Sequence, residues 1–487
     1  MQHYTISPLT THPMNTKKFL LFALTLITYT STFAQNSDDL LNLLIRRNII
    51  KQVEADSIRA TYKNKQVAPS KEKTFLVDLQ VRNRAEYRNG YSNIPADNSS
   101  ASAFVNQRTR LNFEYKQGTA FNAVVSLQDA RVWGSHDPRG LNGTIQLFEG
   151  YVEPNITPNF SVRIGRQRLV YDNQRLFAEN DWRVNGNSHD AITFRYKKNK
   201  LSSELAGAFN QTAERTFGTD YTPTELSITP GNGTAATWTN YKALAVHYLK
   251  YDFDSHASIT TIIASDAYQD VVTKEQNYWR FTYGGRLEYK TNQWYATVNC
   301  YLQSGRNSTG KTIQSWYIQP EVKYSPTSQF AIRLGAEILS GDKGKISDVD
   351  HSFVPLYGVA HRFNGFMDIF TKFPSDLSNA GLVNPYLFIN KKLTDKVEIS
   401  SNNHLFYTQR SFHTTTNQPL TKFMGYEHDL VVTYKPNSYT HLESGFSIAL
   451  PTEAMTTIKK TGNPDRVATW AYLQVKFTPR LFKSTTY

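Results

Sequence analysis

The sequence lacks the features that mark a helical membrane protein, a disulfide-bonded domain or an enzyme. One cysteine in 487 residues permits no internal disulfide. The mean hydropathy is −0.50, and after the N-terminal region no apolar run reaches the roughly 18 residues that a spanning helix needs. The motifs HExxH, GxSxG and the phosphate-binding loop are missing, and the 12 histidines are scattered. These absences exclude a helical bundle and argue against catalysis.

The N-terminal region has the pattern of a secretory signal peptide. Lys17 and Lys18 precede an apolar run, and small residues lead to Ala34, so we predict a signal peptide over 1–34 with cleavage after Ala34. The stretch before Met14 fits poorly as the charged region, which makes Met14 the predicted start of translation. Cleavage removes two lysines and no acids, so the formal net charge falls from +13 to about +11.

Residues 35–73 are predicted to be a periplasmic helical segment with a linker. Ser37 and Asp38 can cap a helix over 37–65, in which leucine, isoleucine and valine recur mostly at intervals of three and four residues. The pattern leaves its role open between a plug, a cell-wall contact and a frayed extension.

From Phe75 onward the side chains alternate between apolar and polar. Trp279 and Phe281, for example, alternate with Arg280 and Thr282. In a transmembrane barrel the apolar face meets lipid, because a charge on that face near the bilayer midplane costs roughly 2–4 kcal/mol. A soluble sandwich shows the same alternation, so this pattern alone leaves both architectures open.

The lengths of the connections favour the barrel. Long polar stretches such as 89–102 and 211–239 alternate with tight turns, as expected when one end of a barrel is periplasmic and the other is elaborated. The eight predicted short connections are 116–119, 155–159, 197–200, 252–255, 290–293, 324–329, 391–396 and 435–439.

The predicted fold is therefore all-β: an antiparallel transmembrane barrel of 18 strands over 74–487, after a short N-terminal helical extension. Residues 352–363 have some strand character but would give an odd count, so they are assigned to a long outer loop. The strands are predicted at 75–88, 103–116, 119–133, 145–155, 159–167, 188–197, 200–210, 240–251, 256–266, 276–290, 293–304, 311–324, 329–342, 383–391, 396–409, 425–435, 439–450 and 467–478. This architecture predicts the outer membrane of a Gram-negative bacterium, with lipid and lipopolysaccharide around the barrel and the barrel assembly machinery as a partner.

Three stretches resemble the alginate export porin family. They are Asn106-Gln107-Arg108-Thr109-Arg110-Leu111 with Gln128-Asp129-Ala130-Arg131-Val132-Trp133-Gly134; Gly165-Arg166-Gln167 through Tyr171, Asp172, Gln174, Arg175 and Leu176 to Asp181-Trp182 and Asp190-Ala191; and Leu356-Tyr357-Gly358 with His361, Phe363, Asn364, Gly365, Met367 and Asp368. The resemblance implies an outer-membrane barrel whose constricted, electropositive pore passes an anionic polysaccharide.

Face parity independently points a set of arginines into the lumen. A guanidinium group keeps its charge and pairs with a carboxylate through two parallel hydrogen bonds, so a row of them favours entry of an acidic sugar chain. The predicted substrate-binding residues, which also include members of the motifs, are Arg82, Arg84, Arg108, Arg110, Arg131, Arg163, Arg166, Gln167, Asp172, Arg175, Asp181, Trp182, Arg195, Arg280, Arg286 and Arg333; Arg88 is also predicted to face inward.

Several alternatives stay open at this point. Inward acids such as Glu153, Glu337 and Glu427 are as numerous as the arginines, so a general diffusion channel with ion-paired walls, or a structural or adhesive barrel, competes with passage of anionic glycans or small anionic solutes. The loop that carries Arg166 to Trp182 either folds inward as a constriction or bonds to itself.

No cofactor, metal or nucleic acid is predicted as a ligand. The basic residues alternate within strands and form no surface block of the kind that binds nucleic acid. Asp342, Asp348 and Asp350 cluster in an outer loop, where calcium is a minor alternative to solvation. Cys300 shares a face with Val298 and Leu302 and is interpreted as an apolar filler.

Overall fold

The structure is a computed structural model, which describes residues 42, 44–47, 49–65, 72–135, 145–219, 221, 224–227, 236–270, 273–342, 348–413 and 418–486. The chain divides into two compact units, Met1–Ser70 and Lys71–Tyr487. The predicted signal peptide and most of the predicted linker lie outside the described residues.

The described part of the first unit contains the helix α3 (Gln52–Lys65). The continuous helix predicted over 37–65 is wrong in this part, because the chain turns at Arg47 and bends at 49–50. Glu54 accepts a hydrogen bond from the backbone N–H of Lys51 at 2.8 Å, which caps a new helix start. Among the described residues, no helix combines the length and apolar content that crossing a membrane requires.

The second unit is a closed antiparallel β-barrel. Within the described residues, 18 strands form its wall, and each pairs with the next along the chain until β21 pairs back to β1. The strands are β1 (Lys73–Asn89), β2 (Ser102–Gln117), β3 (Phe121–Val132), β4 (Gln146–Thr157), β5 (Phe160–Gln167), β6 (His189–Lys198), β7 (Leu201–Phe209), β10 (Ala243–Asp252), β11 (Ala257–Gln269), β12 (Asn277–Lys290), β13 (Trp294–Arg306), β14 (Thr312–Thr327), β15 (Phe330–Leu339), β17 (Leu382–Lys392), β18 (Val397–Thr408), β19 (Phe423–Tyr434), β20 (Thr440–Pro451) and β21 (Ala468–Phe477).

The barrel confirms the predicted fold, and each predicted strand end lies within three residues of the observed one. The two faces also divide as predicted. On β15, for example, the side chain of Leu334 is 63% exposed on the outside, whereas Glu337 is fully buried on the inside. Cys300 is exposed, on the same face as Leu302.

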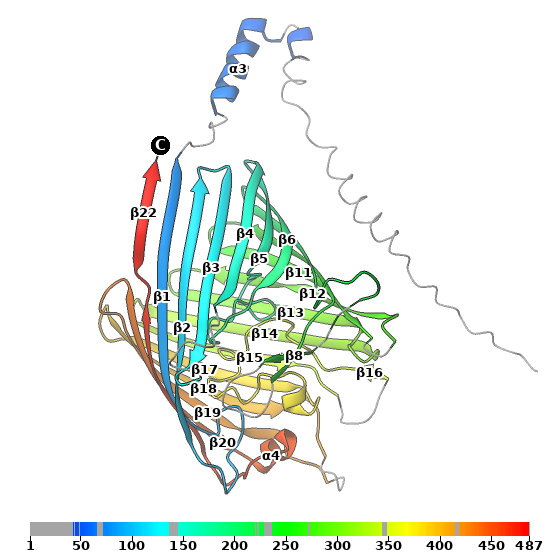
Figure 1. The fold of residues 1–487 in the computed structure, drawn as a ribbon, viewed down its shortest axis with the longest axis vertical. Coiled ribbons are helices and arrows are strands. Elements are labelled where there is room, and N and C mark those ends of the chain that lie inside the picture. The colour runs from blue at the N-terminus through cyan, green and yellow to red at the C-terminus, as the bar shows by residue number, and fades with distance from the viewer. Residues whose placement is uncertain are drawn as a thin grey trace, which may run out of the picture. The chain divides into compact units, whose positions relative to one another are not determined.

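The chain end differs from the prediction. No strand was predicted after residue 478, but β22 (Arg480–Thr486) pairs with the first part of β1 and extends the seam (Figure 1). Pro479 lies at the break between β21 and β22, where its carbonyl accepts a hydrogen bond from the Leu79 N–H at 3.1 Å. Phe482 and Phe75 then meet at 6.2 Å between ring centroids.

Other elements were not predicted. The strands β8 (Thr224–Ser227) and β9 (Ala236–Thr239) form a separate hairpin in the region predicted as a loop over 211–239. The short strand β16 (Val349–Asp350) pairs in parallel with β14. The 3-10 helix η1 (Ser375–Leu377) and the helix α4 (Glu453–Lys459) lie in long loops. Figure 1 shows α4 at the end of the barrel opposite to β22.

Two long loops fold into the lumen. The first inward loop, 168–188, contacts inward side chains from strands all around the wall, including Arg84 on β1, Thr260 on β11 and Gln319 on β14. The second inward loop, 351–381, contains the stretch 352–363 that was predicted to be loop and not strand. Its backbone is anchored to β19, where Glu427 accepts the Met367 N–H at 2.8 Å.

The two inward loops pair with each other. Phe177 and Tyr357 form a short parallel bridge, and the N–H of Val359 donates to the carbonyl of Gln174 at 3.0 Å. The backbones approach so closely that a Cβ atom on Gly358 would lie 1.9 Å from the carbonyl oxygen of Arg175. Only glycine fits at this contact.

An apolar core fills the space between the loops and the wall. The fully buried side chains of Phe353, Met367 and Phe370 come from the second inward loop and pack with Phe177 of the first. From the wall and α4, this core takes in Phe406, Met424, Met455, Ile458 and Trp470. The lumen of this barrel is therefore partly filled by a folded interior.

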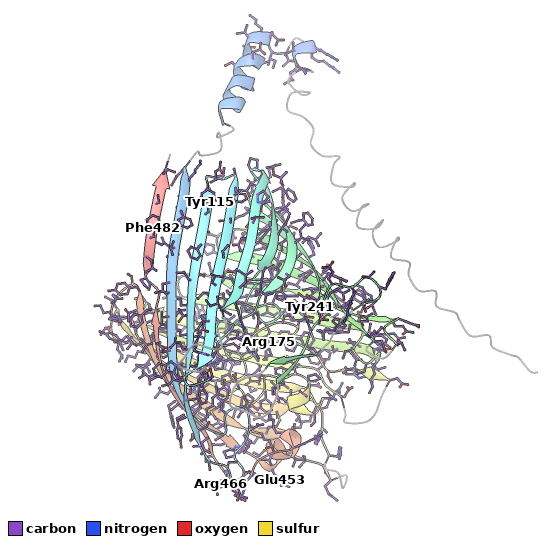
Figure 2. All side chains as sticks on the ribbon, in the orientation of Figure 1. Tyr115, Arg175, Tyr241, Glu453, Arg466 and Phe482 are labelled. Atoms are coloured by element: carbon purple, nitrogen blue, oxygen red, sulfur yellow. The ribbon has the colours of Figure 1, made fainter. Side chains whose placement is uncertain are left out.

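Arg175 joins the two loops to the wall. Its side chain is 1% exposed and forms an ion pair with Glu337 on β15 at 2.5 Å. It also donates to the carbonyl of Val359 at 2.9 Å and to the side chain of Asn364 at 3.0 Å. Figure 2 shows Arg175 midway between Phe482 and Glu453, which mark opposite ends of the barrel.

The exposed outer face predicts a position-specific cost for charge. Leu334→Arg places a cation on the apolar face of β15 and should lower the free energy of unfolding in phospholipid vesicles by about 2–4 kcal/mol. Thr433→Arg, which faces the interior, serves as the control and should change that free energy by much less. Equal losses in urea titrations followed by tryptophan fluorescence would contradict the assignment of faces.

The Arg175 contacts predict a local loosening. Arg175→Met leaves Glu337 buried without its cationic partner, a change that costs roughly 3–5 kcal/mol. Hydrogen exchange should therefore accelerate at least tenfold in 168–188 and 351–381, with little change in the strands. Arg131→Met removes an outer-face ion pair and is the matched control. Unchanged exchange in both loops would show that Arg175 does not hold them.

Candidate functional site

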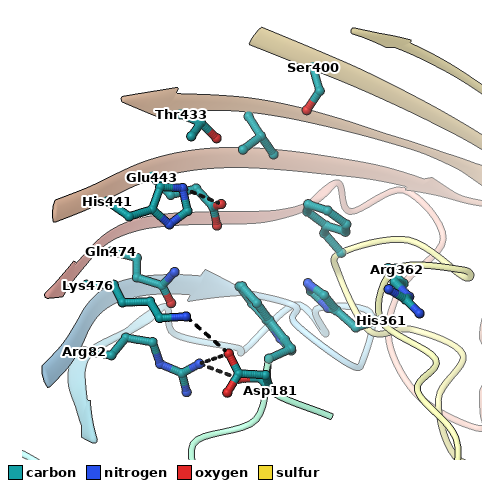
Figure 3. Close-up of a pocket in the computed structure, with 13 residues that line it drawn as sticks. Arg82, Asp181, His361, Arg362, Ser400, Thr433, His441, Glu443, Gln474 and Lys476 are labelled. Carbon is teal, nitrogen blue, oxygen red and sulfur yellow. Dashed lines mark hydrogen bonds and ion pairs between the residues drawn. The ribbon is translucent and has the colours of Figure 1, made fainter. Parts of the chain in front are cut away.

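The interior contains a cavity of about 390 Å³ between the inward loops and the wall. Its wall side is formed by strands near the seam of the barrel, and its loop side by the two inward loops (Figure 3). The described residues that line it are Arg82, Asp181, Trp182, His361, Arg362, Phe366, Ser400, Val431, Thr433, His441, Glu443, Gln474 and Lys476. Most of these residues are charged or polar, although their carbon atoms also line the cavity, so it can hold a polar solute with an apolar part.

Strand register brings basic side chains together across the seam. Arg82 on β1 is directly opposite Arg108 on β2 and Lys476 on β21, and Lys476 is in turn opposite His441 on β20. Cross-strand partners share a face of the sheet, so these side chains form one row that crosses four neighbouring strands. We call Arg82, Arg108, Lys476 and His441 the seam row.

Asp181 of the first inward loop meets the seam row. Its carboxylate accepts a hydrogen bond from Arg108 at 2.5 Å and lies 3.6 Å from the Lys476 ammonium and 3.9 Å from the Arg82 guanidinium. Although burial acts to raise it, these three cations hold the pKa of the Asp181 carboxyl below its ordinary value. Asp181 therefore carries a negative charge around neutral pH.

The loop backbone around Asp181 is bound by arginine side chains of β1, independently of the Asp181 carboxylate. Arg82 donates to the carbonyl of Arg183 at 2.8 Å, and Arg84 to that of Trp182 at 3.1 Å. Arg84 also covers one face of the Trp182 ring at 3.9 Å, while the ring of His361 stacks with Trp182 at a centroid distance of 3.9 Å. Trp182 is thus sandwiched, and it acts in packing and not as an open stacking platform for a solute.

The remaining inward arginines that the sequence predicted are buried or partly buried on the lumen face, where each meets a wall partner. Arg163 and Arg195 share Glu153 at 2.7 and 2.8 Å. The other pairs are Arg88 with Glu86, Arg280 with Asp266, Arg286 with Glu288, Arg333 with Glu321, and Arg110 with Gln128. Most of these arginines stiffen the wall as cross-strand pairs, and their role in substrate binding stays a prediction.

Two predicted site residues lie on the other face. Arg131 pairs with Asp129 at 2.6 Å and is opposite Gln107, on the face that carries the apolar residues of β2. Arg166 has the parity of the exposed Ile164 and pairs with Asp190 at 2.9 Å. Their assignment to the lumen face is wrong: both residues lie in strands that were predicted, and the alternation within those strands places them with the exposed Val125 and Ile164.

Gln167 and Asp172 have structural positions. The Gln167 amide, 1% exposed at the end of β5, bonds to the carbonyl of Ala191 at 2.8 Å. Asp172 accepts hydrogen bonds from Thr260 at 2.9 Å and Tyr248 at 3.1 Å. Burial raises the pKa of the Asp172 carboxyl, and these hydrogen bonds oppose the rise only in part.

Sequence reasoning missed Lys476, His441 and Arg362 as cavity residues. The alternation of the last strand already placed Lys476 opposite its apolar face, but the seam contact with Arg82 becomes visible only when the barrel closes. Arg362 donates to the carbonyl of Asn173 from within the second inward loop, a position that no local pattern indicates.

The described residues hold no group of three or more histidine, cysteine or acidic side chains suited to a metal ion. Asp342, one of the residues considered for calcium, accepts a hydrogen bond from the backbone of His351 at 3.1 Å. Asp350 is bound by Asn307 at 2.8 Å. The contacts of these carboxylates are with neighbouring loop residues, so the calcium alternative gains no support.

Several solved structures share this fold. Pseudomonas aeruginosa OccK9 (OpdG) matches with a TM-score of 0.57 at 13% sequence identity, covering 84% of this chain and 98% of that chain. Acinetobacter baumannii OccAB1 gives a TM-score of 0.57 at 12% identity, covering 84% and 97%. Pseudomonas aeruginosa OpdK with vanillate gives 0.53 at 12% identity, covering 85% and 99%. No curated protein sequence matches the chain.

The sequence comparison identifies a family. The family model described as alginate export matches residues 75–457, which is most of the barrel. Both the family and the barrel fold are those of outer-membrane channel porins. The chain therefore belongs to the alginate export family of outer-membrane channels.

Proposed function

We propose that this outer-membrane channel passes small anionic solutes, with acidic mono- and oligosaccharides as the preferred class, in a Gram-negative bacterium. The observation that carries the proposal is the excess of cations in the cavity: Arg82, Arg362 and Lys476 line it with Asp181 and Glu443, and buried Arg108 lies directly behind Asp181. A carboxylate on each sugar matches such a row, and weak contacts let the solute move on.

The filled interior favours short solutes over a polymer. A cavity of about 390 Å³ is at the lower end of the roughly 300–1,000 Å³ typical of ligand pockets. Two inward loops and an apolar core occupy the space beside it. A polysaccharide would have to displace these loops, which are tied to the wall through Arg175 and Glu337.

A general diffusion channel is the second candidate. It is favoured by the pairing of nearly every predicted inward arginine with an acid, as in the Arg280–Asp266 pair at 2.5 Å. Such pairs give a polar wall with little net charge. The two candidates differ in anion preference and in block by acidic sugars.

Single-channel recordings in planar bilayers test the proposal. Permeability should be greater for chloride than for potassium, and galacturonate or its short oligomers should reduce the current at millimolar concentrations, while neutral galactose should not. Cation preference, or no effect of the uronates, would leave the general diffusion channel. Passage of a long polyuronate through the wild-type channel would overturn the preference for short solutes.

Lys476→Gln tests the cavity directly. Among the residues that the structure describes, the Lys476 ammonium group pairs with Asp181 alone. Its replacement should therefore lower the chloride preference and weaken the galacturonate block severalfold without unfolding the barrel. Lys391→Gln, on the exposed end of β17, is the matched control. Equal effects of the two variants would show that solutes do not pass through the cavity.

A further inference from the structure

The three cations around Asp181 are unequally buried. The side chains of Arg108 and Arg82 are 0% and 5% exposed, whereas those of Asp181 and Lys476 are 35% and 26% exposed. Asp181 is thus the more exposed partner of two buried guanidinium groups, and Figure 3 shows it facing Arg82 and Lys476. The other acid of the cavity, Glu443, is bound by Tyr472 at 2.8 Å and lies 3.9 Å from His441.

We propose that Arg82, Arg108 and Lys476 form a binding site for a single carboxylate, and that Asp181 occupies it as an internal substitute for the carboxylate of the solute. An arriving anion then competes with Asp181 for the same cations. This inference rests on the proposed function, because it assigns the cavity a solute with a carboxylate.

The cations require a counter-charge. Buried guanidinium groups are desolvated, and removing their partner carries a large penalty unless another anion replaces it. Three positive groups share the single Asp181 carboxylate within 4 Å. An incoming carboxylate restores the charge balance when Asp181 turns away into the cavity.

The loop can release the Asp181 side chain without unfolding. Its backbone stays bound through Arg82 to Arg183 at 2.8 Å and Gln128 to Asn185 at 2.9 Å. Arg108 also keeps a contact with Gln80 at 3.0 Å. Exchange of the carboxylate therefore needs a side-chain rotation and not an opening of the barrel.

Competition explains how a strongly cationic site can serve transport. A solute that bound to all three cations without a competitor would leave slowly, and conduction needs binding weak enough for exit. Asp181 lowers the apparent affinity, since the site is already filled when the solute arrives. The Asp181 carboxylate also balances the charge of the three cations when no solute is bound.

Asp181→Asn tests this idea. The substitution keeps the shape but removes the competing charge, so the galacturonate concentration that halves the current should fall about tenfold, as expected for loss of one charge-assisted contact. The dwell time of each blocking event should lengthen, and chloride preference should rise. Asp190→Asn, the outer-face partner of Arg166, is the matched control and should change none of these. Lys476→Gln added to Asp181→Asn should reverse most of the gain.

The outcomes separate the two proposals. If the wild type shows neither anion preference nor uronate block, the proposed function fails. If the wild type is blocked but Asp181→Asn binds galacturonate equally or more weakly, Asp181 is a structural residue and the competition is wrong.

A second measurement uses only the wild-type protein and therefore tests the inference even if the Asp181→Asn variant folds poorly. In the wild type, saturating galacturonate should accelerate hydrogen exchange in 180–184, because the loop loses its side-chain contact, whereas galactose should not. Unchanged or slower exchange there would also overturn the inference.

Discussion

The interior of this barrel depends on one buried ion pair. Arg175 and Glu337 join the first inward loop to β15, and the same guanidinium group reaches Val359 and Asn364 of the second loop. A buried ion pair contributes little net stability compared with apolar packing, but removing only one of its two partners is strongly destabilising. Its effect is to specify one arrangement: both loops must enter the lumen together, because each supplies partners that the other lacks.

Charge in the lumen follows from that arrangement. Most inward arginines on the wall are matched by acids on the same or a nearby strand, as Arg163 and Arg195 are by Glu153, so they make the wall polar without making it strongly positive. The local excess lies at the seam, where Arg82, Arg108 and Lys476 converge on Asp181. The unbalanced charge of the lumen is therefore confined to a short segment, which the inward loops contact through Asp181.

The sequence predicted the wall well and the interior poorly, for a physical reason. Alternation with period two and the contrast of short and long connections are local signals, and they located all 18 wall strands. The entry of the loops depends instead on contacts far apart in the chain, such as Phe177 with Tyr357. Arg131 and Arg166 were assigned to the lumen, although the alternation within their own strands places both side chains on the outer face. Arg131, for example, shares that face with its partner Asp129, two residues away. The strand β22 was missed because Pro479 interrupts the pattern.

The position of the site at the seam links barrel closure to charge. Arg82 and Arg108 belong to the first two strands, whereas Lys476 belongs to the last long strand, almost 400 residues later. These cations become neighbours only when β21 pairs with β1, and Asp181 can meet all three only after the first inward loop has entered. Repulsion among the cations works against the pairing of β21 with β1, because like charges directly opposite in a sheet are destabilising. In the folded barrel the Asp181 carboxylate offsets part of this repulsion, since it lies within 4 Å of all three cations.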